Sequence, residues 1–271
     1  MKSFKQLSND RVNLMLVDSL NLSFRWKHRG DNNFAHAFLS TIQSLANSYN
    51  AKKVIVLGDG GSDWRKSVSP EYKQNRKDKY ANQSEEEQKA FEDFMEGYKK
   101  ALELTSTAYP VVKFKGVEAD DLAAYLVKHY ADFYEHTWLI STDKDWDLLV
   151  DENVSRFSYK SRAEIGLATW HRQYDYAPEH HIDIKVLTGD SGDNVKGIAG
   201  IGPGRAAQLV ERYGSALDIY ASLPLEGKQK FIQALNESGD LILDNFKLMD
   251  LLTYCDEIVT DEAKEMIGEI M

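Results

Sequence analysis

Cysteine is nearly absent from this chain, and long apolar runs are missing altogether. Cys255 is the sole cysteine among 271 residues, so no disulfide can form within the chain, and no Cys-x-x-Cys pair indicates zinc. No stretch reaches the run of about eighteen apolar residues that a membrane-spanning helix needs. The sequence therefore predicts a protein of a reducing, cytoplasmic compartment that has no part in the membrane.

Basic residues are also scarce relative to acidic ones. The chain has 33 Lys and Arg against 43 Asp and Glu, which gives a formal net charge of −10. This acidic mean at first argues against a nucleic-acid partner. Between Asp63 and Lys79, however, six basic residues outnumber three acidic ones. Because phosphate binding depends on local charge, the composition remains compatible with a nucleic-acid partner.

Three continuous apolar runs predict a parallel β-sheet. The runs Val12–Val17, Val54–Leu57 and Trp138–Ile140 are each followed within three residues by an aspartate. Continuous rather than alternating runs, separated by helical stretches, indicate strands that helices cover on both faces. We expect shorter strands near Val111–Phe114 and Val154–Phe157. The fold class is therefore α/β, with a mostly parallel sheet flanked by helices.

The segments between these strands are mainly helical. Phe34–Tyr49 and Ala81–Thr107 carry apolar residues at helical spacing. Gly60–Tyr80 is polar, charged and long for a loop, a type of connection that is usually functional or disordered. From about His181 onward the sequence predicts helices joined by glycine turns. The length allows one large α/β domain with a helical appendage.

Nine acidic residues form the main candidate site. A single aspartate after a strand is more often a helix cap or turn residue, but here the pattern is repeated. The carboxyl ends of parallel strands meet at one edge of a sheet, so we expect these carboxylates to converge. Such a cluster needs cations, and hard divalent ions such as Mg²⁺ match oxygen ligands best. The nine residues are Asp18, Asp59, Glu118, Asp120, Asp121, Asp143, Asp145, Asp190 and Asp193.

The placement of Asp120 stays open at this stage. On an ideal helix, Glu118 and Asp121 share one face and Asp120 faces away. Asp120 joins the cluster only if Glu118–Asp120 forms the turn that enters the helix. Acids in a first helical turn also complement the helix dipole without binding any metal. No histidine obviously belongs to the set, which disfavours zinc.

A glycine-rich segment follows the last acids. Gly197, Gly200 and Gly202 permit tight turns and a close approach of the backbone to phosphate, and a helix is expected to begin near Pro203. Carbonyl groups in such a turn can also hold a monovalent cation. An ordinary packing element between two helices is the alternative interpretation.

Tyr72 lies beside Lys73 and close to Arg76, a combination that suits base stacking and phosphate neutralisation. A solvated charged loop is the alternative. Trp64 and Trp146 could stack on bases as well, although Trp146 is expected to pack internally.

Taken in order, several sequence blocks resemble the 5′-nuclease family, and most closely its stand-alone phage flap endonucleases. The blocks are MLVDSLNL, VLGD, PEYKQNR, GVEADDLAAY, WLISTDKDWD and LTGDSGDNVKGIAGIGPGRAAQLV. The resemblance implies a PIN-like nuclease domain over residues 1–180, with a helical arch at about 70–107. It also implies a helical DNA-binding region over residues 181–271, packed on the nuclease domain, with a helix-three-turn-helix at about 185–214.

The resemblance also implies roles for individual residues. Asp18, Asp59, Glu118, Asp120 and Asp143 resemble a first metal site, and Asp121, Asp145, Asp190 and Asp193 resemble the remaining ligands, with their division left open. Lys73 and Arg76 match the catalytic Lys and Arg at the base of the arch, and Tyr72 matches a residue that stacks on substrate. The implied DNA contacts are Lys196, Gly197, Gly200, Gly202, Gly204 and Arg205.

The family implies an activity as well. It cuts phosphodiester bonds near the junctions of 5′ flaps and trims from free 5′ ends, leaving 5′-phosphate products. Two or more Mg²⁺ ions are implied, with Mn²⁺ as a substitute and K⁺ at the helix-three-turn-helix. We expect a monomer that acts in DNA replication and RNA primer removal beside a separate DNA polymerase, in the host cytoplasm if phage-encoded.

Three other functions compete with this hypothesis. A PIN-type ribonuclease shares the acidic sheet edge, but such domains are usually shorter and lack the arch and the glycine segment. A catalytically inactive binder of DNA junctions would be expected to lose metal acids, and none is missing here. A metal-dependent phosphatase would not need the glycine segment.

Overall fold

The computed structural model describes residues 12–271, which form two compact units. Unit 1 comprises the described residues up to Ser62, together with Ser84–Thr169 and Leu251–Met271. Unit 2 comprises Asp63–Gln83 and Trp170–Asp250. The two units interleave along the chain, and the domain boundary expected near residue 180 stays a prediction.

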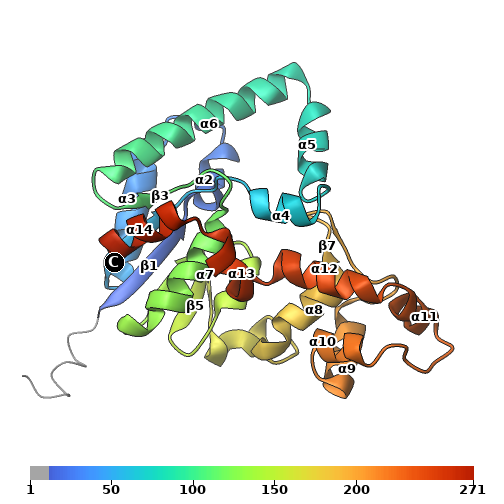
Figure 1. The fold of residues 1–271 in the computed structure, drawn as a ribbon. Helices are drawn as coiled ribbons and strands as arrows, with labels where there is room; N and C mark the ends of the chain where they lie inside the picture. The colour runs from blue at the N-terminus through green and yellow to red at the C-terminus, as the bar shows by residue number, and fades with distance from the viewer. Residues whose placement is uncertain (1–11) are drawn as a thin grey trace, which may run out of the picture. The chain divides into compact units, whose positions relative to one another are not determined.

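Unit 1 is built on a six-stranded sheet with the order β3-β2-β1-β4-β5-β6 (Figure 1). Neighbouring strands from β3 to β5 are parallel, and β6 pairs antiparallel with β5. The predicted mostly parallel sheet is therefore confirmed. The edge strand β6 was not expected, because its three residues are too short and too exposed to give a pattern. The strands are β1 (Asn13–Asp18), β2 (Ala51–Leu57), β3 (Val111–Val112), β4 (Thr137–Ile140), β5 (Val154–Ser158) and β6 (Ala163–Ile165).

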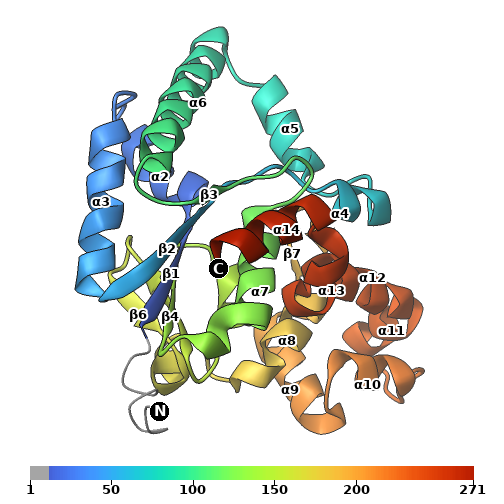
Figure 2. The same ribbon diagram turned by 60° about the vertical axis from the view of Figure 1, so that its left-hand side comes forward.

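Helices cover both faces of this sheet (Figure 2). Met15 and Val17 of β1 enter a core with Phe38 of α3 and Phe94 of α6, whereas α7 and α13 pack together and α7 contacts β1 and β2. Alternate side chains of each buried strand thus face opposite helical layers, which explains the continuous apolar runs. The helices of unit 1 are α2 (Ser19–Lys27), α3 (Ala35–Ser48), α6 (Glu85–Ser106), α7 (Ala119–Tyr130), α13 (Leu251–Ile258) and α14 (Asp261–Ile270), with 3-10 turns η1 (Ala131–Phe133) and η2 (Asp145–Leu149).

The start of α6 is defined by a capping box. The Ser84 hydroxyl accepts a hydrogen bond from the Glu87 amide, and the Glu87 carboxylate accepts one from the Ser84 amide. These bonds satisfy two amides that the first turn would otherwise leave without partners. The long helix predicted from Ala81 therefore begins at Glu85 instead.

Strand order reverses at β1, and this reversal positions the candidate site. The chain continues from β1 to β2 and β3 on one side, then returns to β4 on the other. In parallel sheets, a crevice forms at such a switch point, beyond the carboxyl ends of the strands. Asp18 is the last residue of β1, and therefore lies at the carboxyl edge of the sheet where the order reverses.

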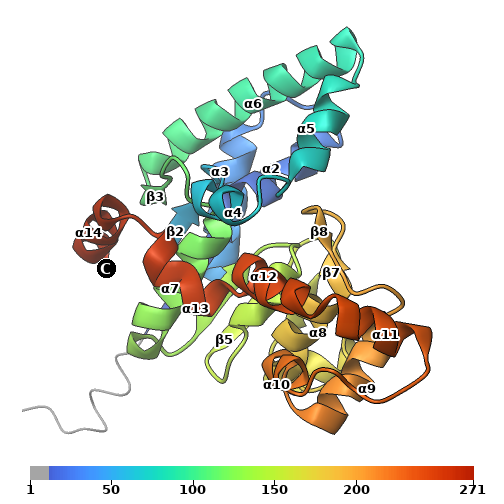
Figure 3. The same ribbon diagram turned by 45° about the vertical axis from the view of Figure 1, so that its right-hand side comes forward.

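Unit 2 is largely helical, with α8 packed against α9, α10 and α12 (Figure 3). Ile184, Leu187, Leu209 and Ile219 contribute to its core. Its elements are α4 (Asp63–Val68), α5 (Gln74–Ala81), η4 (Pro178–His180), α8 (His181–Thr188), α9 (Pro203–Tyr213), α10 (Ala216–Ala221), α11 (Lys230–Glu237), α12 (Gly239–Met249) and a hairpin of β7 (Gly189–Asp190) and β8 (Val195–Lys196); η3 (Leu167–Arg172) links the units.

The segment predicted as a long loop, Gly60–Tyr80, is instead mostly ordered as α4 and α5. Its order comes from tertiary contacts, because the buried Arg65 of α4 donates from Nε to the Leu248 carbonyl oxygen at 2.8 Å. No helix within residues 12–271 combines the length and the hydrophobicity needed to cross a membrane.

Candidate functional site

Seven of the nine predicted acids lie at the carboxyl edge of the unit 1 sheet. Asp18 ends β1, and Asp59 lies two residues beyond β2. Glu118, Asp120 and Asp121 lie at the start of α7, and Asp143 and Asp145 follow β4. The structure thus places these seven carboxylates where the sequence predicted them, on elements that end or begin at one edge.

A glycine holds the loop of Asp59 against the entrance of α7. The Gly60 amide donates to the Val117 carbonyl oxygen at 2.9 Å, and the Gly60 carbonyl accepts from the Gly116 amide at 2.9 Å. A Cβ atom at Gly60 would lie 1.7 Å from the Phe114 carbonyl oxygen. Only glycine allows this approach, which brings the loop of Asp59 to the residue before Glu118.

Asp18, one of the seven acids at the edge, has a clearly raised pKa. Burial raises its pKa to about 7, and the negative charges of Asp143 and Asp59 add to this rise. Hydrogen bonds from the Ser141 hydroxyl, at 2.8 Å, and from the Asn21 amide, at 3.1 Å, oppose it. An ionised Asp18 is therefore unfavourable here unless a cation lies beside it.

The start of α7 defines the position of Asp120, whose role as a metal ligand stays a prediction. Glu118 has an extended backbone, with φ −81° and ψ 155°, and is the N-cap of the helix. Asp120 therefore lies in the first turn, where its Oδ1 accepts a hydrogen bond from Trp146 Nε1 at 2.6 Å. This contact brings Asp120 to the η2 turn, which begins at Asp145.

The loop that carries Asp143 is tied to β1 and α2 by a chain of hydrogen bonds. The β1–β4 register pairs Val17 with Ile140, so Asp18 lies beside Ser141. The Ser141 hydroxyl accepts from the Asp143 amide at 3.0 Å, and Asp143 Oδ1 accepts from the Asp145 amide at 3.0 Å. Hydrogen bonds within the loop that follows β4 thus hold the Asp143 carboxylate in position.

A buried ion pair between Arg156 of β5 and Asp147 of η2 also holds the loop that carries Asp143. Asp147 accepts from Arg156 Nε at 2.5 Å and from Nη2 at 2.8 Å, and Arg156 Nη1 donates to the Ser141 carbonyl at 3.1 Å. Both side chains are buried. Sequence reasoning missed this pair. The available signal was a charge at an inward position between Val154 and Phe157 in a predicted strand, since a buried arginine requires an anionic partner.

The donor chemistry of the edge fits a hard divalent cation, because the seven side chains offer carboxylate oxygens and no histidine. Among residues 12–271, no three His, Cys, Asp or Glu side chains are already arranged to hold a metal ion. Asp18, Asp120 and Asp143 instead accept hydrogen bonds from Ser141, Trp146 and the Asp145 amide. A carboxylate has about four lone-pair sites, so these hydrogen bonds leave oxygen lone pairs available to a metal ion.

The other two predicted acids lie in unit 2, at the β7–β8 turn. Asp193 Oδ2 accepts from the Tyr72 hydroxyl at 3.0 Å and lies 3.4 Å from Lys73 Nζ. Its Oδ1 forms an ion pair with Arg76. Asp190 Oδ2 lies 3.6 Å from Lys185 Nζ. Three predicted functional side chains thus converge on one predicted acid.

Lys73 is held in an unusual backbone conformation by this convergence. Its φ of 56° lies in the left-handed region, which costs a residue with a side chain roughly 1–2 kcal/mol. The Lys73 amide donates to the Asp193 carbonyl oxygen at 2.9 Å, which helps to offset that cost. Tyr72 is only 5% exposed and packs with Val195. Stacking of Tyr72 on a substrate stays a prediction, and it requires the ring to become exposed.

The glycines of the predicted DNA-contacting segment differ in how much space surrounds them. A Cβ atom at Gly197 would lie 2.0 Å from the Thr188 carbonyl oxygen, so this glycine allows close packing on α8. Around Gly202 and Gly204 an added Cβ would meet nothing within 4 Å. The helix that follows begins at Pro203, as predicted.

Two further residues of this segment are basic. The Arg205 side chain donates from Nη1 to the Gly200 carbonyl oxygen at 2.5 Å and lies 5.0 Å from the Phe231 ring centroid. Lys196 is exposed, and its Nζ lies 3.8 Å from Glu71 Oε2. Gly200 has a φ of 79°, which favours glycine. The DNA-binding roles of these residues stay predictions.

A group of acids at the switch point of a parallel sheet is typical of enzymes that act on phosphates with divalent metal ions. Residues 13–177 match the family described as "5′-3′ exonuclease, N-terminal resolvase-like domain", and residues 176–266 match "5′-3′ exonuclease, C-terminal SAM fold". The chain belongs to the 5′-3′ exonuclease family.

Individual relatives agree with this assignment. The chain is 46% identical over 262 residues to the flap endonuclease of Escherichia phage T5, which covers 96% of this chain and 90% of that protein. It is 31% identical over 245 residues to flap endonuclease Xni of Aeromonas hydrophila, covering 86% of this chain and 88% of the relative. The resemblance to stand-alone phage-type 5′-nucleases is thereby confirmed.

Solved structures support the fold. A crystal structure of the phage T5 protein co-crystallised with metal ions matches with a TM-score of 0.91 at 46% identity, over 95% of this chain and 99% of that one. A pseudo-enzyme-product complex of the phage T5 flap endonuclease with DNA and metal ions matches with a TM-score of 0.92 at 46% identity, over 95% and 98%. The predicted fold class is confirmed.

Proposed function

We propose that this chain is a structure-specific 5′ nuclease that hydrolyses phosphodiester bonds with the help of divalent metal ions. The observation that carries the proposal is the group of seven carboxylates at the switch-point edge of unit 1. Membership of the 5′-3′ exonuclease family and the likeness to a flap endonuclease crystallised with DNA and metal ions support it.

The seven edge acids would hold the metal ions, for which Mg²⁺ is the proposed species and Mn²⁺ a substitute. When bound, such ions activate water and stabilise charge on the attacked phosphate. The chain's own residues would prepare this centre. Ser141 and Asn21 orient Asp18, and Trp146 orients Asp120. The ligand roles of Asp190 and Asp193 rest on the family resemblance alone.

Lys73 and Arg76 are proposed to neutralise charge on the scissile phosphate. Both side chains already engage an anion, the Asp193 carboxylate. A substrate phosphate would compete with that carboxylate for the same cations, so both side chains suit an anionic ligand. Tyr72 is proposed to stack on the substrate once its ring is released.

The glycine segment is proposed to contact the backbone of duplex DNA. Open space around Gly202 and Gly204 supports a close approach of phosphate, with Lys196 and Arg205 as the accompanying cations. Gly197 and Gly200 would shape the turn, and the turn's carbonyl groups would hold K⁺.

The proposed substrates are DNA with 5′ flaps or free 5′ ends and RNA primers on DNA, cut to give 5′-phosphate products. We propose a monomer that acts during DNA replication in the cytoplasm, beside a separate polymerase. A flap, a nicked duplex and a single strand, each labelled at the 5′ end, should be incubated with and without Mg²⁺ and the products sized. Cleavage at the flap junction only with Mg²⁺ is expected, whereas cleavage without any divalent ion would contradict the proposal.

A matched pair of variants tests the metal acids. Asp143→Asn should reduce cleavage by more than the roughly 10–100-fold typical of residues that only orient a ligand, and should leave duplex binding nearly intact. Asp132→Asn removes an exposed acid outside the cluster and should behave like the parent. Full activity of Asp143→Asn on a flap in Mg²⁺ would exclude its ligand role.

A further inference from the structure

Two segments of unit 2 are joined by a reciprocal pair of asparagine side chains. Asn75, in the first turn of α5, donates from Nδ2 to the Ser191 carbonyl oxygen at 2.8 Å. Asn194, the last residue before β8, donates from Nδ2 to the Glu71 carbonyl oxygen at 2.8 Å. Asn75 and Asn194 are here called the asparagine clasp. Each segment thus supplies a side-chain donor to a backbone carbonyl of the other.

Asn194 meets two requirements that few residues meet together. Its φ of 60° lies in the left-handed region, which asparagine adopts more readily than most residues with a side chain. Its side chain must also donate, because its partner is a carbonyl oxygen. Aspartate could adopt the same backbone but has no donor when ionised, and glycine has no side chain at all.

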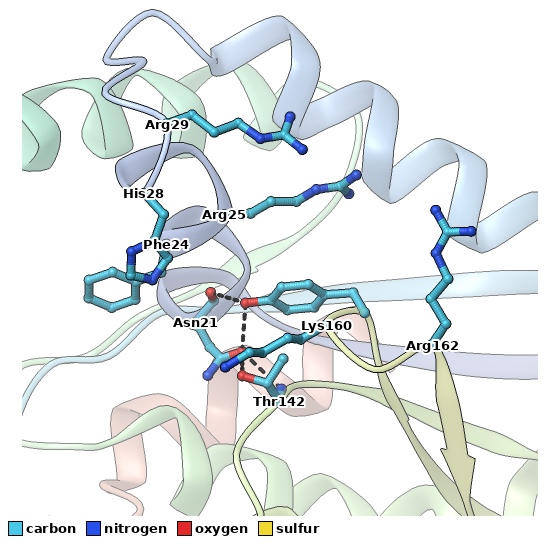
Figure 4. Close-up of a pocket in the computed structure, with 9 residues that line it drawn as sticks. Asn21, Phe24, Arg25, His28, Arg29, Thr142, Lys160 and Arg162 are labelled. Atoms are coloured by element: carbon cyan, nitrogen blue, oxygen red, sulfur yellow. Dashed lines mark hydrogen bonds between the residues drawn. The ribbon is translucent and has the colours of Figure 1, made fainter.

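The polarity of the amide distinguishes the clasp from Asn21 of unit 1. There the side-chain oxygen accepts from the amide and the hydroxyl of Thr142, both at 2.9 Å (Figure 4). Asn21→Asp would keep an acceptor for both contacts. In the clasp the amide nitrogen makes the contact, so an aspartate would set two oxygens against each other. Exchange of asparagine for aspartate therefore breaks the clasp with little change of shape.

The clasp holds a turn in which Lys73 has an unusual conformation. The Gln74 amide donates to the Glu71 carbonyl oxygen at 3.0 Å, so Lys73 is the third residue of a four-residue turn. A positive φ at this position is usually met by glycine or asparagine, yet Lys73 has a φ of 56°. Contacts from outside the turn are therefore needed to hold it. Asn194 supplies one of them, to the residue that opens the turn.

The positions of two cations follow from this backbone. A right-handed backbone at Lys73 would redirect its Cα–Cβ bond and the flexible stem that carries the ammonium group. Arg76 lies one residue beyond Asn75, and its Nε donates to the Gly192 carbonyl oxygen at 3.2 Å. Both cations also pair with the Asp193 carboxylate, but a substrate phosphate would compete for them. Hydrogen bonds between neutral groups would survive that exchange.

We propose that Asn75 and Asn194 are positioning residues for Lys73 and Arg76, an inference that rests on the proposed function. The clasp holds the turn at Lys73 in its left-handed conformation. It keeps both cations in place when a substrate phosphate displaces the Asp193 carboxylate. Its contribution is to the rate of bond cleavage, and duplex binding does not depend on it.

The main test compares Asn194→Asp with Asn153→Asp. Asn153 Nδ2 also donates to a backbone carbonyl, that of Ala131 in unit 1, at 3.1 Å, so both variants exchange a donor for an acceptor. Single-turnover cleavage of a flap in Mg²⁺ should slow about 10–100-fold in Asn194→Asp, because a misplacement of about 1 Å can cost about 100-fold. Its affinity for the same flap, measured in Ca²⁺, should stay close to that of the parent. The control should match the parent in both measurements.

A double-mutant cycle separates positioning from a loss of structure. In a Lys73→Ala background no ammonium group remains to be misplaced, so Asn194→Asp should slow cleavage by a smaller factor than in the parent. A purely structural role predicts the same factor in both backgrounds. Equal factors, or a full rate in Asn194→Asp alone, would overturn the proposal. If Asn194→Asp does not fold, Asn194→Gly replaces it, because glycine accepts the backbone conformation and only the donor is lost.

Asn75→Asp tests the other half of the clasp. An acid in the first turn of α5 complements the helix dipole, so the helix itself should not be weakened. Cleavage should nevertheless slow, because the carboxylate would face the Ser191 carbonyl oxygen. A rate equal to that of the parent would contradict the role of Asn75.

Hydrogen exchange provides a readout that needs no cleavage. The Lys73 amide donates to the Asp193 carbonyl oxygen, so peptides that span residues 71–76 should exchange faster in Asn194→Asp than in the parent or in Asn153→Asp. Equal exchange in all three proteins would also overturn the proposal. If the parent cut no substrate in Mg²⁺, the proposed function would fail, and the exchange rates would still decide whether the clasp holds the turn.

Discussion

Single residues of this site are constrained by opposing electrostatic demands. Asp18 is buried, and burial together with two neighbouring carboxylates raises its pKa to about 7. Stability alone would favour an uncharged residue at this position. The cation proposed above would account for an acid at this position, because the crowded carboxylates would then contribute to its affinity. Function and folding therefore place contrary requirements on this residue.

Trp146 offers a test of how finely an acid must be oriented. Trp146→Phe keeps an aromatic ring in the core but removes the 2.6 Å hydrogen bond to Asp120. We expect the Mg²⁺ concentration for half-maximal activity to rise about 10–100-fold, the usual effect of losing a partner that orients a ligand. Trp170→Phe is the matched control, because that indole donates to the Tyr176 carbonyl oxygen, away from the acids. An unchanged Mg²⁺ requirement in Trp146→Phe would show that Asp120 needs no such orientation.

At the level of elements, the β4–η2 loop depends on the Arg156–Asp147 pair beneath it. Arg156→Met would leave Asp147 buried without its guanidinium partner, which should destabilise the protein by about 3–5 kcal/mol in urea unfolding. Arg156→Met/Asp147→Leu should recover most of this stability, because no buried charge remains. Cleavage by the double variant should stay reduced if the pair also positions Asp143. Full stability and full activity in the double variant would mean that the pair has no positioning role.

The contact between α7 and α13 predicts a dependence of stability on pH. Hydrogen bonds from Lys128 and His129 lower the pKa of Asp256 below its ordinary value of 3.8. A lowered pKa stabilises the folded state above the ordinary value, and this contribution is lost as the pH falls through the lowered one. Asp256→Asn should therefore be less stable than the parent at pH 6, by about 1 kcal/mol or less for an exposed pair. The difference should shrink below pH 4 in thermal unfolding, and a constant difference down to pH 2 would contradict the assignment.

Across the whole molecule, the sequence predicted the strands and acids that follow a repeated local pattern. It missed the features that depend on contacts between residues far apart in the chain. The strands at β1, β2 and β4 follow from continuous apolar runs, and the aspartates after them follow from the geometry of parallel sheets. The burial of Tyr72 and the order of α4 could not be predicted, because both depend on contacts with residues more than a hundred positions away. The role of Asp120 stayed open, since it depended on where α7 begins.

The uneven distribution of the acids between the two units predicts where metal ions stabilise the protein. Seven of the nine predicted ligands lie in unit 1, so Mg²⁺ should protect that unit against local opening. At about 100 times the dissociation constant, a ligand stabilises the form that binds it by about 2.7 kcal/mol. Hydrogen exchange with and without Mg²⁺ should therefore show slower exchange at the ends of β1 and β4, and no change in α10.

The same experiment tests the two acids of unit 2. Added protection at the turn between Asp190 and Asp193 is expected if these side chains also bind the ions, because the turn's amides then gain the stability of the bound state. Asp193→Asn should abolish that local gain and leave the protection of β1 in place. If the turn shows no gain in the parent, the ligand role that the family resemblance implies for Asp190 and Asp193 is wrong in the absence of substrate.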